Sequence, residues 1–149
     1  MTITGIIEDG VRDKLLATSA VTTLLGTRIR TERIEESATV NPYTKAKLVY
    51  AVIRKENAQS DVENHAGGAT TLAMANLTIG VFGPTWEEAR NAGIAIRNAI
   101  NATRGAFGNE WVSRCEVRDF FSAGAAPDRD DEVGVPGYGL SVEISYRTS

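Results

Sequence analysis

The sequence has one cysteine and one histidine among its 149 residues. Cys115 therefore has no partner for a disulfide within the chain, which suits a reducing cytoplasm. Catalytic metal sites need several side-chain ligands, and a chain with only His65 and Cys115 as nitrogen and sulfur ligands is short of them. Walker motifs, nucleophile elbows and zinc-ligand spacings are also missing from the sequence. We expect no cofactor and no metal, and we expect that the protein is not an enzyme.

Long apolar runs and clusters of basic residues are missing as well. No stretch approaches the roughly 20 apolar residues of a membrane-spanning helix, so we expect no contact with a membrane. The N-terminus reaches Glu8 and Asp9 without a basic region, which is not the pattern of a secretory signal. The net charge is −3, and acidic residues directly follow the densest basic group, Arg28, Arg30 and Arg33. This mixture argues against tight binding of nucleic acid.

What is present is a globular composition, with 42% hydrophobic and 23% charged residues. A chain of this length buries enough apolar surface to fold without a disulfide or a metal. We therefore expect one domain that spans residues 1–149.

Two segments carry a helical pattern. Ile7, Val11 and Leu15 recur at a spacing of four, which predicts a helix over about 4–18. Thr85 and Glu88 form a capping box that opens a second helix, which we expect to run to about Thr103. We expect Arg104 and Gly105 to end this helix, and we expect its buried stripe to hold Trp86, Ala89, Gly93, Ile96 and Ile100. Between the two helices, Ser19 and Gly26 bound a short apolar turn.

Alternating patterns predict strands over about 27–34, 46–55, 70–82, 110–121 and 139–147. The expected fold is α+β, with a single antiparallel or mixed β-sheet of about four to five strands and two main helices on one face. The strand over 70–82 is apolar on both faces, and helices on one side cover only one of them. Either a second subunit or loops of the same chain cover the other face.

Two polar segments hold the residues that could carry chemistry. One contains Asp61, Glu63 and His65, and the other contains Asp128, Asp130, Asp131 and Glu132. The second segment fails as a calcium-binding EF-hand because Val133 stands where the turn requires glycine. Neither segment shows the apolar enclosure that raises the pKa of one carboxylate for acid–base catalysis. We interpret both as solvated loops or as contact surfaces for a partner.

Cys115 has no histidine nearby in the sequence to activate it, so we expect a small buried or interfacial side chain. Gly134, Gly137 and Gly139 precede a strand rather than a helix, which is not the pattern of a phosphate-binding loop.

The order of four segments resembles a known family. These are AVTTLLGTRI (Ala20–Ile29), NPYTKAKLVYAVI (Asn41–Ile53), LTIGVFGPTWEEARNAGIAIRNAI (Leu77–Ile100) and GLSVEISYRTS (Gly139–Ser149). The chain resembles the tail-completion or tail-terminator proteins of tailed bacteriophages over nearly its full length. The segment from Ser122 to Tyr138 is longer than this family's pattern, so its role does not carry over.

The resemblance implies a structural virion protein without a cofactor or a catalytic activity. Such a protein forms a homo-oligomer, a hexameric ring in the neck of the particle, assembled in the host cytoplasm. One side of the ring binds the tail-tube protein, the other binds the stopper protein of the head–tail connector, and genomic DNA passes through the channel without sequence-specific binding. On this reading, residues 61–65 and 128–132 are assembly loops. The alternative is a small oligomeric ligand-binding or regulatory α+β domain, and an unrecognised hydrolase comes third.

Overall fold

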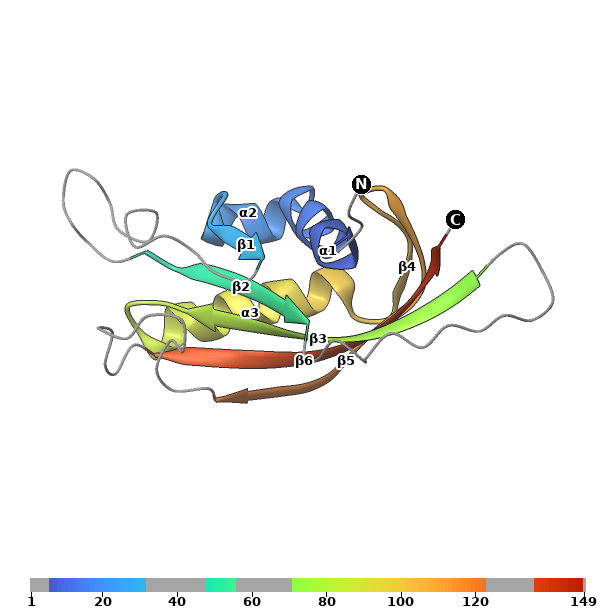
Figure 1. Ribbon diagram of the computed structural model, residues 1–149. Coiled ribbons are helices and arrows are strands. Elements are labelled where there is room, and N and C mark those ends of the chain that lie inside the picture. The colour runs from blue at the N-terminus through green and yellow to red at the C-terminus, as the bar shows by residue number, and fades with distance from the viewer. Residues whose placement is uncertain (1–5, 32–47, 56–70, 123–135, 149) are drawn as a thin grey trace.

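The computed structural model of the protein describes residues 6–31, 48–55, 71–122 and 136–148. These residues form a single mixed β-sheet with helices on one face (Figure 1). The described residues form three helices and six strands: α1 (Ile6–Leu16), α2 (Ser19–Leu25), β1 (Ile29–Thr31), β2 (Tyr50–Lys55), β3 (Thr71–Phe82), α3 (Trp86–Ile100), β4 (Thr103–Phe107), β5 (Glu110–Ser122) and β6 (Gly137–Thr148). The α+β class and the mixed sheet are confirmed. The expected four to five strands and two main helices were too few.

The strand order is β1-β2-β3-β6-β5-β4. β1 and β2 run parallel, and the other neighbouring pairs of the described sheet are antiparallel. β3 and β6 form the centre and pair along their whole length, from Thr71 opposite Thr148 to Phe82 opposite Gly137. The shorter strands β2 and β4 each pair with only part of a long neighbour.

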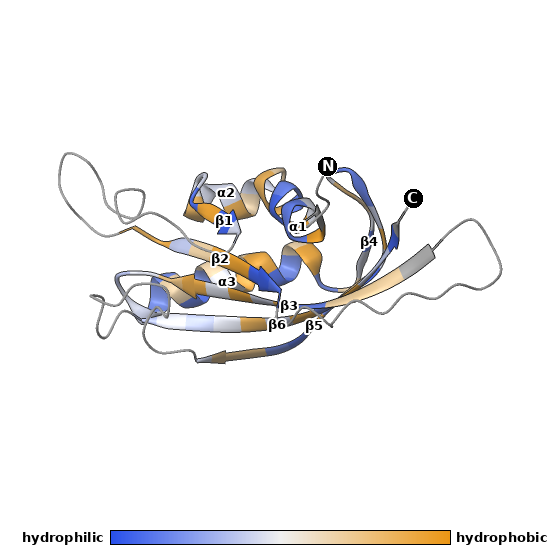
Figure 2. Ribbon diagram, in the orientation of Figure 1, coloured by the Kyte–Doolittle hydropathy of each residue, from blue (hydrophilic) through white to orange (hydrophobic). Residues whose placement is uncertain are grey.

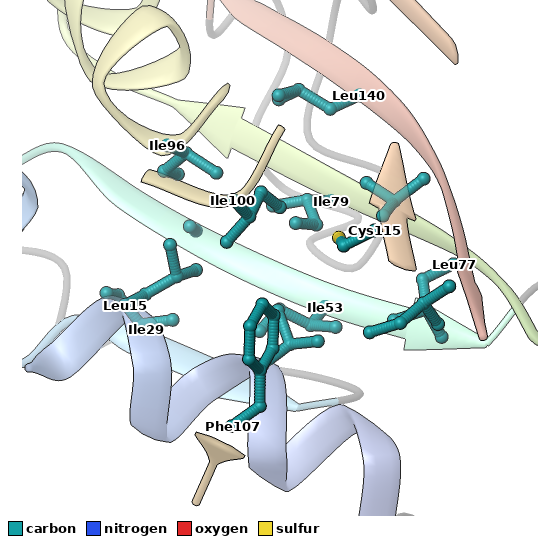
Figure 3. Close-up of a cluster of buried hydrophobic side chains, with 14 of the residues drawn as sticks. Leu15, Ile29, Ile53, Leu77, Ile79, Ile96, Ile100, Phe107, Cys115 and Leu140 are labelled. Atoms are coloured by element: carbon teal, nitrogen blue, oxygen red, sulfur yellow. The ribbon is translucent and has the colours of Figure 1, made fainter. Parts of the chain in front are cut away.

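The core lies between the sheet and the helices. Its largest fully buried side chains come from both layers (Figure 3): Phe107, Leu15, Leu25, Ile29, Ile53, Leu77, Ile79, Ile96, Ile100, Leu140 and Ile144. α3 packs on β3, β6 and β5, while α1 contacts both edge strands, β1 and β4. Because one helix reaches both edges, the sheet must curl around the helical layer. In Figure 2 each helix combines apolar and polar positions, as expected for helices with one buried face.

The N-terminal helices follow the predicted stripe. Ile7, Val11 and Leu15 are buried in the core. The predicted turn after α1 is a short helix, and Ser19 is its first residue rather than its N-cap, which is Thr18. Gly26 ends α2 with a φ of 57°, a conformation that glycine adopts without steric cost.

The start of α3 confirms the predicted N-cap, with one change in the capping box. The Thr85 hydroxyl accepts a hydrogen bond from the Glu88 N–H at 3.1 Å. The Glu88 carboxylate accepts from the Thr85 hydroxyl at 3.2 Å, instead of reaching the Thr85 backbone N–H. The predicted stripe is right for Ala89, Gly93, Ile96 and Ile100, which are buried, and wrong for Trp86, which is 48% exposed.

The end of α3 differs from the prediction. The helix stops at Ile100, with Asn101 as C-cap, and Ala102 takes a positive φ of 58° to turn the chain. The chain then enters β4, so Arg104 and Gly105 lie in a strand and do not end the helix. Arg97 is the basic residue of the last turn of the helix. Because Gly105 was interpreted as the end of the helix, β4 is missing from the predicted strands.

Candidate functional site

We call the sheet surface that faces away from the helices the outer face. Side chains alternate along a strand, so the core positions of β3 and β6 leave every second residue on the outer face. Paired residues share a face, which fixes the outer-face members of β2 and β5. The described outer-face residues are Tyr50, Val52, Arg54, Met74, Asn76, Thr78, Phe82, Trp111, Arg114, Glu116, Arg118, Asp119, Phe121, Ser141, Glu143, Ser145 and Arg147.

A network of four charged side chains crosses the middle of this face. Arg118 contacts the Glu143 carboxylate at 2.6 Å and the Glu116 carboxylate at 3.4 Å. Arg114 donates to Glu116 from its Nε at 2.7 Å. Two arginines thus neutralise two glutamates, so this part of the outer face has no net charge.

The network resolves a conflict within the sheet. Glu116 and Glu143 are directly paired across β5 and β6, and like charges in that position repel. The register shifts between Val117 and Asp119, so Arg118 is an extra residue at a bulge. Its guanidinium reaches both carboxylates. The hydrogen bond from Arg114 lowers the pKa of Glu116, and the bond to Glu143 raises the pKa of Arg118.

One end of the outer face is aromatic. Tyr50 and Phe82 pack with ring centroids 5.5 Å apart, and both are 2% exposed. The neighbouring Gly80 lies against the Phe82 ring, and Gly139 lies against the Phe121 ring. At this end of the outer face Tyr50, Val52 and Phe82 are therefore buried, whereas Phe121 is 39% exposed.

Five large apolar side chains in the described ranges are exposed. The set is Leu24 at 40%, Met74 at 37%, Trp86 at 48%, Trp111 at 49% and Phe121 at 39%. Met74, Trp111 and Phe121 belong to the outer face. Met74 and Trp111 lie near each other at one end of this face, opposite Ser145 and Arg147 of β6, whereas Phe121 lies at the other end, opposite Gly139.

Trp86 belongs to a second aromatic group at the start of α3. Its ring meets Tyr138 edge-on at 5.6 Å, and Tyr138 in turn packs against Phe120 at 5.3 Å. The Arg97 guanidinium lies over the Phe120 ring at 5.6 Å from its centroid. These contacts fix α3 on β5 and β6, so we assign the group a structural role.

Cys115 is fully buried in the core, as predicted. Burial raises the pKa of its thiol to about 12, so the thiolate nucleophile is not formed near neutral pH. The side chain fills space between the sheet and the helices (Figure 3).

The residues of the two polar segments singled out from the sequence lie outside the described residues. This holds for Asp61, Glu63 and His65 and for Asp128, Asp130, Asp131 and Glu132. Within the described ranges, no group of three or more His, Cys, Asp or Glu side chains is placed to hold a metal ion. None of the helices in the described ranges is long and apolar enough to cross a membrane.

The sequence analysis missed the outer-face network. Its signal was present in the alternation Arg114, Glu116, Arg118, which puts charges at every second position of a strand. Their partner Glu143 lies in the predicted strand over 139–147, but the pairing of β5 with β6 cannot be read from sequence.

Comparison with known proteins shows a shared fold. A chain from a solved structure described as "Virion of native gene transfer agent (GTA) particle" superposes with a TM-score of 0.61. The two chains are 12% identical, and the match covers 93% of this chain and 92% of that chain. No protein-family profile matches the sequence, and no curated protein sequence matches it. At this identity the likeness defines the architecture, an α+β domain of the kind found in that particle.

Proposed function

We propose that the protein is a structural component of a phage-like virion. The observation that carries this proposal is the shared fold with a chain of a gene transfer agent virion over nearly the full length of both chains. The sequence resemblance to tail-terminator proteins supports the same class independently, because it rests on segments of the chain and not on the fold. The role is structural and needs no catalytic group.

We further propose that copies of the chain form a hexameric ring that caps the tail tube and joins it to the connector of the head. Its partners are the tail-tube protein on one side and the stopper protein on the other. The exposed Met74, Trp111 and Phe121 support this proposal, because an assembly buries apolar surface that a monomer leaves in water. A closed ring of identical subunits uses head-to-tail interfaces.

Genomic DNA passes through such a ring, and we propose that the middle of the outer face, between its apolar ends, lines the channel. The network of Arg114, Glu116, Arg118 and Glu143 pairs its charges, so it offers phosphates no excess of cations. A wall of this kind favours passage over tight binding, since affinity for DNA grows with the number of phosphates that a protein neutralises.

The first test is the mass of the purified protein by light scattering over a range of protein and salt concentrations. We expect a hexamer, or a monomer that becomes a hexamer when tail-tube protein is added. A stable monomer or dimer that does not assemble with tail components would contradict the proposal.

The second test concerns the two proposed assembly loops. Residues 61–65 and 128–132 are removed separately, and the far-ultraviolet circular dichroism of each variant is compared with that of the full chain. We expect the fold to persist and the joining of heads to tails to fail. Particles produced at normal yield by either variant would exclude that loop as an assembly element.

A further inference from the structure

The described ranges and the remaining segments of the chain carry opposite net charges. The described ranges contain twelve basic and nine acidic residues, whereas the remaining segments contain four basic and ten acidic residues. Residues 128–132 (DRDDE) alone hold four carboxylates and one guanidinium, and we call them the acidic segment. This division of charge favours a contact between an acidic segment and a basic surface of the described part.

Two exposed arginines lie beside Trp111 at one end of the outer face. Trp111 is 49% exposed, and it pairs with Arg147 of β6 on one side and with Ala106 of β4 on the other. The alternation of burial along β4 puts Arg104 on the same face as Ala106. Arg104 and Arg147 are both exposed. We call Trp111, Arg104 and Arg147 the Trp111 patch.

The arginines of this patch differ from those in the middle of the outer face. The network there neutralises its two arginines with two glutamates. Among the described residues, by contrast, no carboxylate forms an ion pair with Arg104 or Arg147. A guanidinium binds a carboxylate through two parallel hydrogen bonds, and an adjacent indole ring excludes water from such a contact. The Trp111 patch is therefore suited to an acidic segment.

The acidic segment of the same copy is too far away to reach the Trp111 patch. Ser122, the last residue of β5, pairs with Tyr138, which lies nine residues before Arg147 on β6. Nine residues of strand span about 30 Å. Each carboxylate of the acidic segment lies within six residues of Ser122 or of Pro136, and six extended residues reach at most about 22 Å. The segment that reaches the patch must therefore come from another copy.

The positions of the two elements fit a ring. The acidic segment is attached where β5 ends, and the Trp111 patch lies at the other end of the sheet, where β6 ends beside β4 (Figure 1). A contact between two different surfaces of identical copies is heterologous, and such contacts close into a ring when the rotation between copies fits. Elements at opposite ends of the molecule are thus placed for head-to-tail contact.

We propose that the acidic segment of one copy binds the Trp111 patch of the next copy. This inference rests on the proposed ring and assigns its subunit contact. Carboxylates of the segment accept hydrogen bonds from the guanidinium groups of Arg104 and Arg147, and the segment covers the exposed ring of Trp111. The covered ring supplies more of the affinity than the ion pairs do, since exposed ion pairs contribute little by themselves.

Reversal of one charge of the patch is the first test. We expect Arg147→Glu to raise the protein concentration needed for assembly at least about tenfold by light scattering, because like charges then face each other. Arg90→Glu is the matched control, since it makes the same charge change at an exposed position of α3. We expect this control to change that concentration less than about twofold. Equal effects of the two variants would show that net charge alone matters and would overturn the patch.

The apolar part of the contact has a different dependence on salt. We expect Trp111→Ala to weaken assembly at low and at high salt, because apolar cover is not screened by ions. The effect of Arg147→Glu should decrease as the salt concentration rises. Assembly of Trp111→Ala at the same concentration as the parent chain would overturn the role of the ring in this contact.

Two chains with reversed charges test whether the contact joins different copies. One chain carries Arg104→Glu and Arg147→Glu, and the other carries Asp130→Arg and Asp131→Arg. Each chain then repels its own copies, so we expect neither to assemble alone. In an equimolar mixture each patch meets a segment of opposite charge on the other chain, so we expect a ring of alternating chains, which a hexamer accommodates. A mixture that assembles no better than its components would overturn the contact between copies.

The competing occupant of the patch is the acidic part of residues 56–70 of the same copy. These residues precede Thr71, which pairs with Thr148 beside Arg147. A chain with Asp61→Arg and Glu63→Arg distinguishes the two occupants, and we expect it to form rings like the parent chain. If it fails to form rings while the chain with Asp130→Arg and Asp131→Arg forms them, the patch binds residues 56–70 and the proposal is wrong.

The outcomes separate this inference from the proposed function. If the parent chain forms no ring even with tail-tube protein, the proposed function fails and this inference fails with it. If the parent chain forms a ring and the folded chain with Arg104→Glu and Arg147→Glu forms it equally well, the ring stands and the Trp111 patch is not its subunit contact. Circular dichroism shows that each variant is folded.

Discussion

Two glycines show how the surroundings of a residue decide the effect of one added methyl group. A Cβ on Gly10 of α1 would lie 2.6 Å from the Phe107 carbonyl oxygen, a backbone atom of β4 that cannot move alone. A Cβ on Gly139 of β6 would lie 2.5 Å from the Phe121 ring. That ring is 39% exposed and can swing into solvent. The two distances are nearly equal, but the neighbouring atoms differ in freedom.

We therefore expect Gly10→Ala to lower the free energy of unfolding by about 1–3 kcal/mol, the range for overpacking. An exposed glycine in a helix would instead gain roughly 1 kcal/mol on replacement by alanine. We expect Gly139→Ala to cost less than about 1 kcal/mol, because an exposed ring can change rotamer at that cost. Urea denaturation of both variants checks this pair. An equal loss in both would show that Phe121 is as rigid as the backbone.

Residue patterns predicted the buried positions well and the exposed ones less well. The stripe of Ile7, Val11 and Leu15 follows from helical geometry alone, and the structure buries all three. Trp86 was placed in the stripe of α3 because its spacing fits. In the structure its ring meets Tyr138 of β6 only edge-on, and 48% of Trp86 is exposed. Periodicity defines a direction around a helix and does not define how far the sheet reaches along it.

Among the elements, β5 shows most clearly that register shifts, and the side-chain contacts that depend on them, cannot be predicted from sequence. Its two register shifts redirect side chains, and the second one brings Arg118 between Glu116 and Glu143. A bulge has no sequence signature as strong as a helix cap, so the contact set of β5 follows only from the structure. β4 was not predicted, for a related reason. Gly105 has a φ of 122° and lies at a bulge between β4 and β5, not at the end of a helix.

The network on β5 predicts a pH dependence of stability. The hydrogen bond from Arg114 keeps the pKa of Glu116 below its ordinary value of 4.5 in the folded chain. A lowered folded pKa contributes stability that is present above the unfolded pKa and is lost as the pH falls through the folded pKa. Stability should therefore decrease below about pH 4.5, and Glu116→Gln should flatten that decrease.

Thermal unfolding of the parent chain and Glu116→Gln at several pH values from about 3 to 7 measures this difference. We expect a small effect, because the pair is exposed to solvent and salt screens it. Glu88→Gln is a matched control, since Glu88 is also exposed but contacts no arginine among the described ion pairs. Identical profiles for the parent chain and Glu116→Gln would show that the network does not stabilise the fold.

For the whole molecule, the fold class could be predicted from the sequence, but the order in which the strands pair could not. The α+β class follows from two helical stripes and several alternating strands, and it is confirmed. The order of strands, with the early β1 and the later β4 at opposite edges, depends on pairing between segments far apart in the chain. Local patterns carry no information on such pairings beyond the face that each strand buries. The candidate surface was therefore not predictable, although most of its residues had been assigned to strands.

Helix α1 couples the two edges of the sheet, since it contacts both β1 and β4. Leu15 of α1 is fully buried beside Ile29 of β1 (Figure 3). Leu15→Ala should lower the free energy of unfolding by about 2–5 kcal/mol, through lost apolar contacts and the cavity that remains. Trp111→Ala is the control, because Trp111 is 49% exposed and lies on the opposite face of the sheet, where its loss should cost much less.

The coupling itself predicts more than a loss of stability. If α1 holds the curl of the sheet, hydrogen exchange in Leu15→Ala should accelerate together at the backbone amides of β1 and β4, which are far apart in the strand order. The amides of β3 and β6 should remain protected until global unfolding, because both strands are central and fully paired. Acceleration at one edge alone would mean that α1 packs on the two edges independently and that the sheet holds its curl without the helix.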